Sequence, residues 1–277
     1  MAEEIYSPDP LMAQQSLEEW VMTKCENWRD YYESNYEESF EEYYRLWRGQ
    51  WDPADSERAS ERSRIISPAL QQAVESNVAE LEEATFGRGK WFDIADDVLD
   101  NQKQDAKYLR RKLTEDFEAC KVRKAVAECL INSAVFGTGI GEVVLEEIKE
   151  MAPAAEPIMG GDLQAVGVNI TDRVVVKLKP VLPQNFLIDS AAADTDLEPD
   201  QDLTIYNDDK VRLTKYYGLV PRELLEAEDI EVEEDSMYVE AIVVIANGGT
   251  LLKAEANPYM MNDRPVVAFP WDVVPGR

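Results

Sequence analysis

The chain has 277 residues, 45% of them hydrophobic and 30% charged, so it can form a substantial core and is not disordered throughout. Acidic residues number 56 against 28 basic ones, and the resulting formal charge of −28 excludes a basic protein that binds nucleic acid by neutralising phosphates. The chain contains no histidine, which excludes Ser-His and Cys-His catalysis and the zinc sites that use histidine.

The cysteines, the N-terminal segment and the apolar runs indicate the redox state of the thiols and whether export or membrane insertion is expected. The cysteines are Cys25, Cys120 and Cys129, an odd number without a Cys-x-x-Cys pair, which predicts reduced thiols in place of a disulfide framework or a four-thiolate metal site. We interpret residues 1–15 as a flexible N-terminus. They lack the basic region and apolar run of a signal peptide, so no export is expected. No apolar run reaches the ~18 to 20 residues needed to cross a bilayer, so we expect no membrane partner.

The segment from Ser16 to about Gly49 predicts one long helix. Ser16 and Glu19 have the spacing of a capping box, and Gly49 supplies a stop. Apolar and aromatic side chains recur near the helical period along it: Leu17, Trp20, Val21, Cys25, Trp28, Tyr32, Phe40, Tyr43, Tyr44 and Trp47.

Such a stripe usually packs within its own chain. A helix of about 30 residues would nevertheless run roughly 45 Å and extend past a compact domain of this size. We therefore hypothesise that part of the stripe contacts a neighbouring subunit or another partner. The candidate interface residues are Trp20, Trp28, Tyr32, Tyr43 and Trp47.

Further helices are expected before residue 137. Ser67 as N-cap and Pro68 as the first helical residue predict a helix that ends near Phe86 and Gly87. Trp91, Phe92 and Ile94 resemble a short strand, and a helical pattern then extends from about residue 101 to 136.

The pattern changes after Gly137 to β-branched runs bounded by turn residues, which predict strands. Met151–Leu163 is interpreted as a hairpin tip or surface linker, and Asn247–Gly249 as a hairpin turn. The expected fold class is α+β, with a helical part at 16–136 and a β-rich part at 137–277 that pack together.

Three glycines, Gly137, Gly139 and Gly141, invite comparison with a phosphate-binding loop. Dinucleotide loops need a strand before the glycines and a helix after them, and here the order is reversed. We therefore predict a structural turn from helix to strand that needs positive φ or close backbone approach.

Charged residues gather in several places. Acidic groups at Asp93–Asp97, Glu142–Glu147 and Asp189–Asp202 could hold Mg²⁺ or perform acid–base chemistry, but chance clustering in so acidic a chain, on solvated surfaces, is the simpler interpretation. Basic groups near Arg58–Arg64, Lys107–Lys112 and Lys121–Lys124 could pair within the chain or across a subunit boundary. Both interpretations of the basic groups stay open.

Several ordered segments together resemble one protein family, the portal (head-to-tail connector) of short-tailed double-stranded DNA phages. They are Glu61–Pro68 with its helix, Ile131–Glu142, Val181–Asp189, and Asn257–Tyr259 leading to Arg264–Val267. The glycine-rich segment followed by Pro-x-Asn-Phe-x-x-Asp is the most specific part, and the likeness covers roughly residues 40–277.

The resemblance implies a structural ring protein, typically dodecameric, at one capsid vertex of the virion, assembled in the host cytoplasm. Such a ring conducts DNA during packaging and ejection and contacts terminase, a tail adaptor and the major capsid protein. It implies no enzyme activity, cofactor or metal. The matching region corresponds to the wing of portals, whose stem, clip and crown would lie mostly beyond Arg277. The acidic surplus is compatible with this role, because it repels the DNA backbone.

Two other functions remain as alternatives. An acidic adaptor or DNA-mimic protein would account for the charge but not for the ordered segments. A Mg²⁺-dependent hydrolase would use the acids of Asp93–Asp97 or Asp189–Asp202.

Overall fold

The computed structural model describes residues 15–52, 66–88, 91–92, 94, 103–157, 163–189, 203–205, 213–230, 236–246, 249–257 and 264–271. Helix and strand are both extensive, as expected for an α+β protein. The helices are α1 (Leu17–Asn35), α2 (Glu37–Trp47), α4 (Ala69–Phe86), α5 (Lys103–Ala119), α6 (Val122–Phe136), the 3₁₀ helix η3 (Pro183–Asn185) and α7 (Arg222–Ala227). The strands are β1 (Thr138–Pro157), β2 (Leu163–Val181), β3 (Phe186–Ile188), β4 (Leu203–Ile205), β5 (Leu213–Pro221), β6 (Tyr238–Ala246), β7 (Thr250–Ala256) and β8 (Val266–Pro270).

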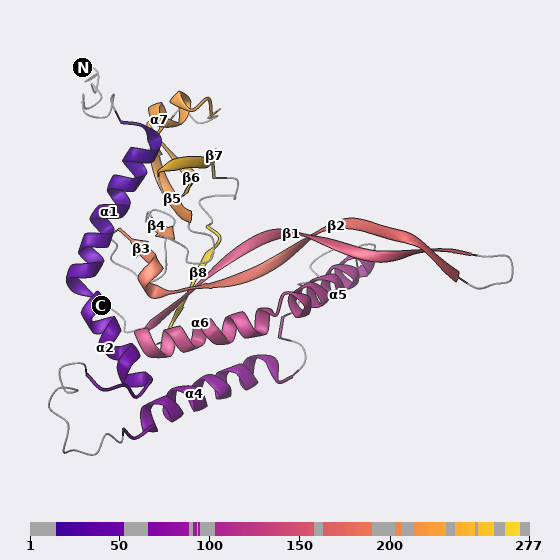
Figure 1. Cartoon of the computed structure of the whole chain (residues 1–277), viewed down its shortest axis with the longest axis horizontal. Coiled ribbons are helices and arrows are strands. Elements are labelled where there is room, and N and C mark those ends of the chain that lie inside the picture. Colours follow the sequence, from indigo (N-terminus) through magenta and orange to yellow (C-terminus); the bar gives the residue numbers. More distant parts are fainter. Residues whose placement is uncertain are drawn as a thin grey trace.

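The strands form two antiparallel sheets. One has the order β2-β1-β8 and the other the order β3-β4-β5-β6-β7. Strands β1 and β2 make a long two-stranded ribbon that leaves the body of the molecule, with α6 and α5 along it and α4 beyond α6 (Figure 1). At about 3.4 Å per residue, the 20 residues of β1 span roughly 65 Å.

The five-stranded sheet is covered on both faces. One face carries a core shared with α1 and α7, which includes Trp28, Tyr216 and Leu225. The other face packs against the base of the ribbon through a second cluster, which includes Ile140, Tyr217 and Ile242. This double burial explains why the run Ile242–Ile245 is continuously apolar and does not alternate with polar residues.

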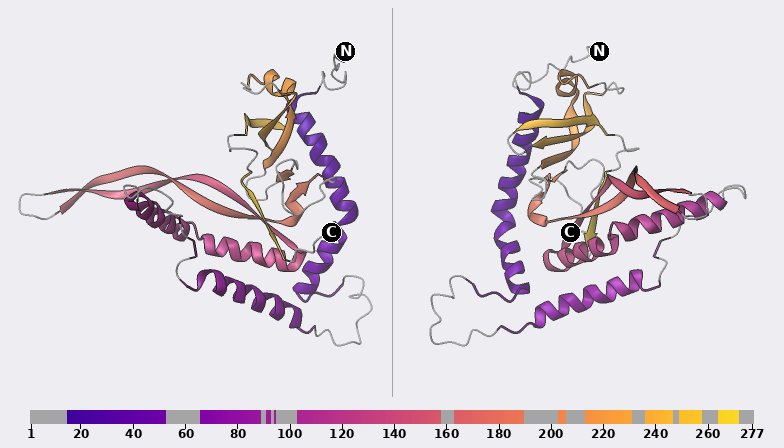
Figure 2. Two further views of the ribbon diagram at one scale, coloured as in Figure 1. Left: turned by 180° about the vertical axis from the view of Figure 1, so that it is seen from behind. Right: turned by 45° about the vertical axis from the view of Figure 1, so that its right-hand side comes forward.

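The single long helix predicted for Ser16–Gly49 is wrong, because the chain forms α1 and α2 with a break at Tyr36. Helix α1 runs beside the five-stranded sheet, and α2 continues roughly in the same direction to the ends of α6 and α4 (Figures 1 and 2). At the break, Tyr36 has φ −125° and ψ −28°, outside helical values. The helical backbone hydrogen bonds continue across the break, since the Tyr36 amide donates to the Tyr32 carbonyl at 2.8 Å and the Phe40 amide to the Tyr36 carbonyl at 2.9 Å. The interruption is therefore a local change of backbone angles. The cap itself is confirmed, since the Glu19 amide donates to Ser16 Oγ at 3.3 Å.

Two further expectations need correction. Pro68, not Ser67, occupies the N-cap position of α4, and it makes no side-chain cap hydrogen bond. Trp91, Phe92 and Ile94 are not in a strand. The indole of Trp91 instead packs against Phe86 and Phe117, with ring centroids 5.1 and 5.3 Å away, because the neighbouring helices bury its surface.

The helical pattern expected from about 101 to 136 is divided between α5 and α6. Lys121 takes left-handed values, φ 55° and ψ 41°, between them. As a result α6 follows the base of the ribbon and α5 its outer part (Figure 1).

Both predicted hairpins are confirmed. Strands β1 and β2 continue to Pro157 and resume at Leu163, so the tip is shorter than the segment Met151–Leu163. Strands β6 and β7 pair across the Asn247–Gly249 turn, of which Asn247 and Gly248 lie outside the described residues. Residues 1–14 of the predicted flexible N-terminus also lie outside them. Within the described ranges, no helix is both long and apolar enough for a membrane span.

The glycine-rich turn from α6 to β1 is as predicted. Gly137 ends α6 with φ +93°, a conformation that disfavours a side chain. A Cβ on Gly139 would overlap the carbonyl oxygen of Cys129, and one on Gly141 would lie 2.9 Å from Leu178 Cδ1. Gly137 therefore supplies the turn, and the other two glycines permit close approach of β1 to α6 and β2.

The cysteines differ in exposure. Cys25 and Cys129 are buried, whereas Cys120 is partly exposed. Burial, followed by the negative charge of Glu128, raises the pKa of the Cys129 thiol to about 12. Its reactive thiolate form is therefore scarce at neutral pH.

Replacement of Gly137 and Gly139 should distinguish the need for positive φ from the need for close backbone approach. We expect Gly139→Ala to lower the free energy of unfolding by about 3 kcal/mol, because backbone atoms cannot move aside, and Gly137→Ala by only about 1 kcal/mol, the cost of a left-handed alanine in open space. Urea denaturation followed by circular dichroism measures both. A larger loss for Gly137→Ala would contradict the assignment.

Thiol labelling should follow exposure. In the native protein, iodoacetamide at neutral pH should modify Cys120 first and leave Cys25 and Cys129 unmodified until urea is added. Peptide mapping by mass spectrometry measures the order, with Cys120→Ser as the control that should take up almost no label. Rapid native modification of Cys129 would show that its site is open.

Candidate subunit interface

The two faces of the β1–β2 ribbon have different environments. Side chains alternate along a strand, so the register pairs Leu145–Val176, Glu147–Val174 and Met151–Ile170 lie on one face of its outer part. The opposite face includes Val175, which is buried, and Arg173.

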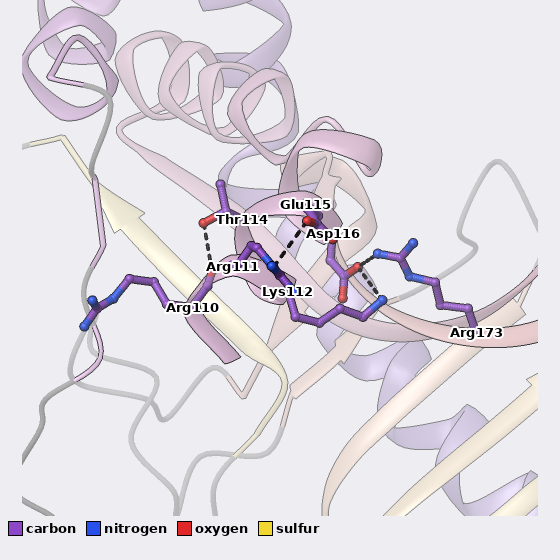
Figure 3. Close-up of polar contacts among 7 residues, drawn as sticks. All are labelled: Arg110, Arg111, Lys112, Thr114, Glu115, Asp116 and Arg173. Carbon is purple, nitrogen blue, oxygen red and sulfur yellow. Dashed lines mark hydrogen bonds and ion pairs between the residues drawn. The ribbon is translucent and has the colours of Figure 1, made fainter. Parts of the chain in front are cut away.

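Helix α5 is held to the inner face by an ion pair between Arg173 and Asp116. Asp116 is buried, and Figure 3 shows the Arg173 guanidinium and the Lys112 ammonium approaching the same carboxylate oxygen. The Lys112 Nζ to Asp116 Oδ1 distance is 3.6 Å. Elsewhere on α5, the Thr114 hydroxyl donates a hydrogen bond to the Arg110 carbonyl within the helix. The Arg110 side chain donates a 3.2 Å hydrogen bond to the carbonyl of Ile94.

The outer face of the ribbon carries large exposed apolar side chains. The relative exposure is 68% for Leu145, 71% for Met151, 59% for Ile170 and 54% for Val174. The same face also carries Glu147, Lys149 and Asp172, which lie between the Leu145–Val176 and Met151–Ile170 pairs. Clustered exposure of large apolar side chains nevertheless marks an interaction site more often than free surface.

The edges of the ribbon are also open along most of its length. Strand β8 pairs with β1 only from Thr138 to Glu142, and among the described strands nothing pairs with the rest of that edge or with the outer edge of β2. A two-stranded ribbon is marginally stable unless another element packs on it. Helices α5 and α6 meet this need on one face, so the other face is the candidate interface.

A buried charged cluster attaches the ribbon base to the five-stranded sheet. Glu142 on β1 is 2% exposed, and both of its carboxylate oxygens accept hydrogen bonds from Lys215 Nζ on β5, at 2.6 and 2.8 Å. The Tyr217 hydroxyl donates a third hydrogen bond to Glu142, at 3.0 Å. This cluster sits beside the apolar contacts of the second core and orients the base of the ribbon.

The predicted interface residues on α1 and α2 differ in their availability. Trp20 and Trp28 are buried in this chain against Tyr216, at centroid distances of 6.0 and 6.1 Å, so the hypothesis that they contact another subunit is corrected. They are buried because α1 packs along the five-stranded sheet. Tyr32 and Trp47 are half-buried and Tyr43 is exposed, so these three stay candidates.

The predicted charged clusters fall into two groups. Asp93, Asp96, Asp97, residues 190–202, residues 231–235 and the Arg58–Arg64 group lie outside the described residues. Within the described part, Glu142 and Glu146 pair with lysines, and Lys112, Arg123 and Lys124 pair with acids of the same chain. There, no three potential ligand residues are grouped so as to hold a metal ion.

Sequence reasoning missed both the ribbon face and the Glu142 cluster. Leu145, Ile170 and Val174 read as ordinary strand residues, and only the register places them together. The sequence favours a solvated surface for Glu142, because the lysine that pairs with it, Lys215 on β5, is 73 residues away along the chain.

Parts of three segments used for the portal resemblance lie together at the base of the ribbon, whereas residues 61–65 and 258–263 lie outside the described residues. Ile140 pairs with Val181 on one side and with Ala268 on the other, so Ile131–Glu142, Val181–Asp189 and the start of β8 are neighbours. The sequence matches no protein-family model, and no curated protein matches it. Arguments about function therefore depend on the residues and their geometry.

The Glu142 cluster can be tested by replacing each partner. Glu142→Gln leaves Lys215 without its counter-charge and should lower the free energy of unfolding by about 3 kcal/mol, while the double variant Glu142→Leu, Lys215→Met should lose less than the sum of its single changes. The matched control is Glu146→Gln on the same strand, where a solvent-exposed pair with Lys177 should contribute less than about 1 kcal/mol. Urea denaturation measures the free energy of unfolding of each variant, and equal losses for Glu142→Gln and Glu146→Gln would refute the structural role.

Proposed function

We propose that this chain is a ring-forming portal (head-to-tail connector) subunit of a short-tailed double-stranded DNA phage, and that the region described is its wing. The observation that carries the proposal is the protruding ribbon, whose outer face exposes four large apolar side chains among charged ones, while helices pack on its inner face. A second copy of the chain is the partner that this surface fits best.

A head-to-tail ring uses two different surfaces of each subunit, so it does not require the apolar face to be self-complementary. The ribbon of one subunit would lie on the next, and the contact would bury the side chains of Leu145, Met151, Ile170 and Val174. Their burial supplies the hydrophobic stabilisation that the charge of −28 on every added copy opposes. Screening over about 8 Å at physiological salt weakens that repulsion.

The resemblance of the ordered segments supports the same proposal, and so does the convergence of parts of three of them at the ribbon base. The role proposed is a conduit for DNA during packaging and ejection, at one capsid vertex, with terminase, a tail adaptor and the major capsid protein as partners. An acidic lining would let DNA pass with little adhesion, because both surfaces are negative. No catalytic role is proposed.

Assembly can be measured directly. Purified protein should form rings with a central hole in negative-stain images and a single large oligomer, of the order of twelve subunits, in native mass spectrometry. Particles that remain monomers or dimers at all concentrations would refute the ring and favour the acidic adaptor or DNA-mimic alternative.

A variant test addresses the ribbon face. The double variant Leu145→Ser, Met151→Ser should shift the population from rings to folded monomers, because it removes exposed apolar surface without touching the inner face. The control is Leu219→Ser, Leu252→Ser, which changes exposed leucines on the other sheet and should assemble as the parent does. Unchanged assembly in the first variant, with a native circular dichroism spectrum, would show that the ring does not use this face.

A further inference from the structure

A second surface lies away from the ribbon, between α2, α6 and η3. Two adjoining cavities of about 440 and 420 Å³ occur there and share Trp47, Ile131 and Leu182 in their walls. Each has the size of a small-ligand pocket. Phe40 packs on Phe136 at one end, with ring centroids 5.4 Å apart, so the cavities form a groove with an apolar floor.

The charged side chains that line the larger cavity are acidic. Glu37 and Glu41 are the acids that line the larger cavity, and no ion pair of either carboxylate occurs within the described part of the chain. Burial, followed by the negative charge of these two glutamates, raises the pKa of Tyr32 in the same wall to about 12. The larger cavity therefore offers two carboxylates to a cation, whereas Lys179 lines the smaller cavity and the Arg48 guanidinium lies 5.2 Å from the Trp47 ring.

The wall also contains a hydrogen-bond donor that lacks an acceptor. The indole Nε1 of Trp47, which lines both cavities, is buried and has no hydrogen-bond partner within the described residues. A buried donor without an acceptor is costly and is usually satisfied by some group. A backbone carbonyl entering the groove would supply that acceptor.

We propose that this groove binds an extended peptide segment of a partner protein, in which a bulky apolar side chain neighbours lysine or arginine. The apolar side chain would fill the floor between Phe40 and Ile131, the cation would pair with Glu37 or Glu41, and a backbone carbonyl would accept from Trp47. A nucleic acid or an acidic segment would be repelled by the same carboxylates. The inference goes beyond ring formation and does not depend on it.

Three synthetic peptides test the chemistry of the occupant. The probe is fluorescein-labelled Gly-Ser-Arg-Leu-Arg-Phe-Lys-Ser, and the two controls replace either its basic residues by Glu or its Leu and Phe by Ser. Titration of the full chain, followed by fluorescence anisotropy at physiological salt, should give saturable binding for the probe alone. If the control without Leu and Phe bound as tightly as the probe, net charge alone would explain binding and the proposal would be overturned. Absence of probe binding would also overturn it.

Variants locate the site. Glu37→Gln, Glu41→Gln should weaken probe binding about fivefold, whereas Glu38→Gln, Glu42→Gln, with the same change in charge on the same helix but outside the groove, should leave it within about twofold. Trp47→Phe keeps an aromatic ring and removes the donor, and should also weaken binding about fivefold. Equal weakening by both glutamine pairs, or unchanged binding in Trp47→Phe with a native circular dichroism spectrum, would overturn the assignment.

Discussion

The contact between Glu142 and Lys215 joins the two sheets, and the direction of the ribbon depends on it. A carboxylate that is 2% exposed needs a close counter-charge, because burial of an unpaired charge costs several kcal/mol. Here Lys215 and Tyr217 on β5 bind both carboxylate oxygens, so the base of β1 is fixed against the five-stranded sheet at one defined place. The glycines at 139 and 141 let α6 and β2 close around the same point. The base of the ribbon is thus constrained by polar and steric contacts together.

Beyond its base, the stability of the ribbon depends on what covers each of its two faces. Helices α5 and α6 cover one of them, and the buried pair of Asp116 with Arg173 ties α5 to β2. The other face leaves Leu145, Met151, Ile170 and Val174 in water, an arrangement that association with another chain would relieve. The proposal of a ring subunit follows from this asymmetry, since a protruding apolar arm has little use in a protein that acts alone.

The acidic surplus acts differently on the two proposed contact surfaces. On the ribbon, attraction must come from apolar burial, because identical subunits carry identical charge. In the groove beside α2, unpaired carboxylates at Glu37 and Glu41 favour a basic partner and reject an acidic one. One surface would therefore recognise a copy of the chain and the other a different molecule.

The sequence by itself determined where several elements begin and end. The Ser16 cap, the change from helix to strand at Gly137 and the turn before Thr250 each depend on residues within a few positions, so all three were predictable. Tertiary structure decided which faces are buried. Trp20 and Trp28 belong to the core only because Tyr216 lies beside them, and the 1-residue interruption at Tyr36 could not be read from an unbroken aromatic period. Leu145 and Ile170 form one surface only through the register of β1 with β2. The physical reason is that backbone preferences act between neighbours, whereas burial and charge pairing depend on residues brought together by the fold.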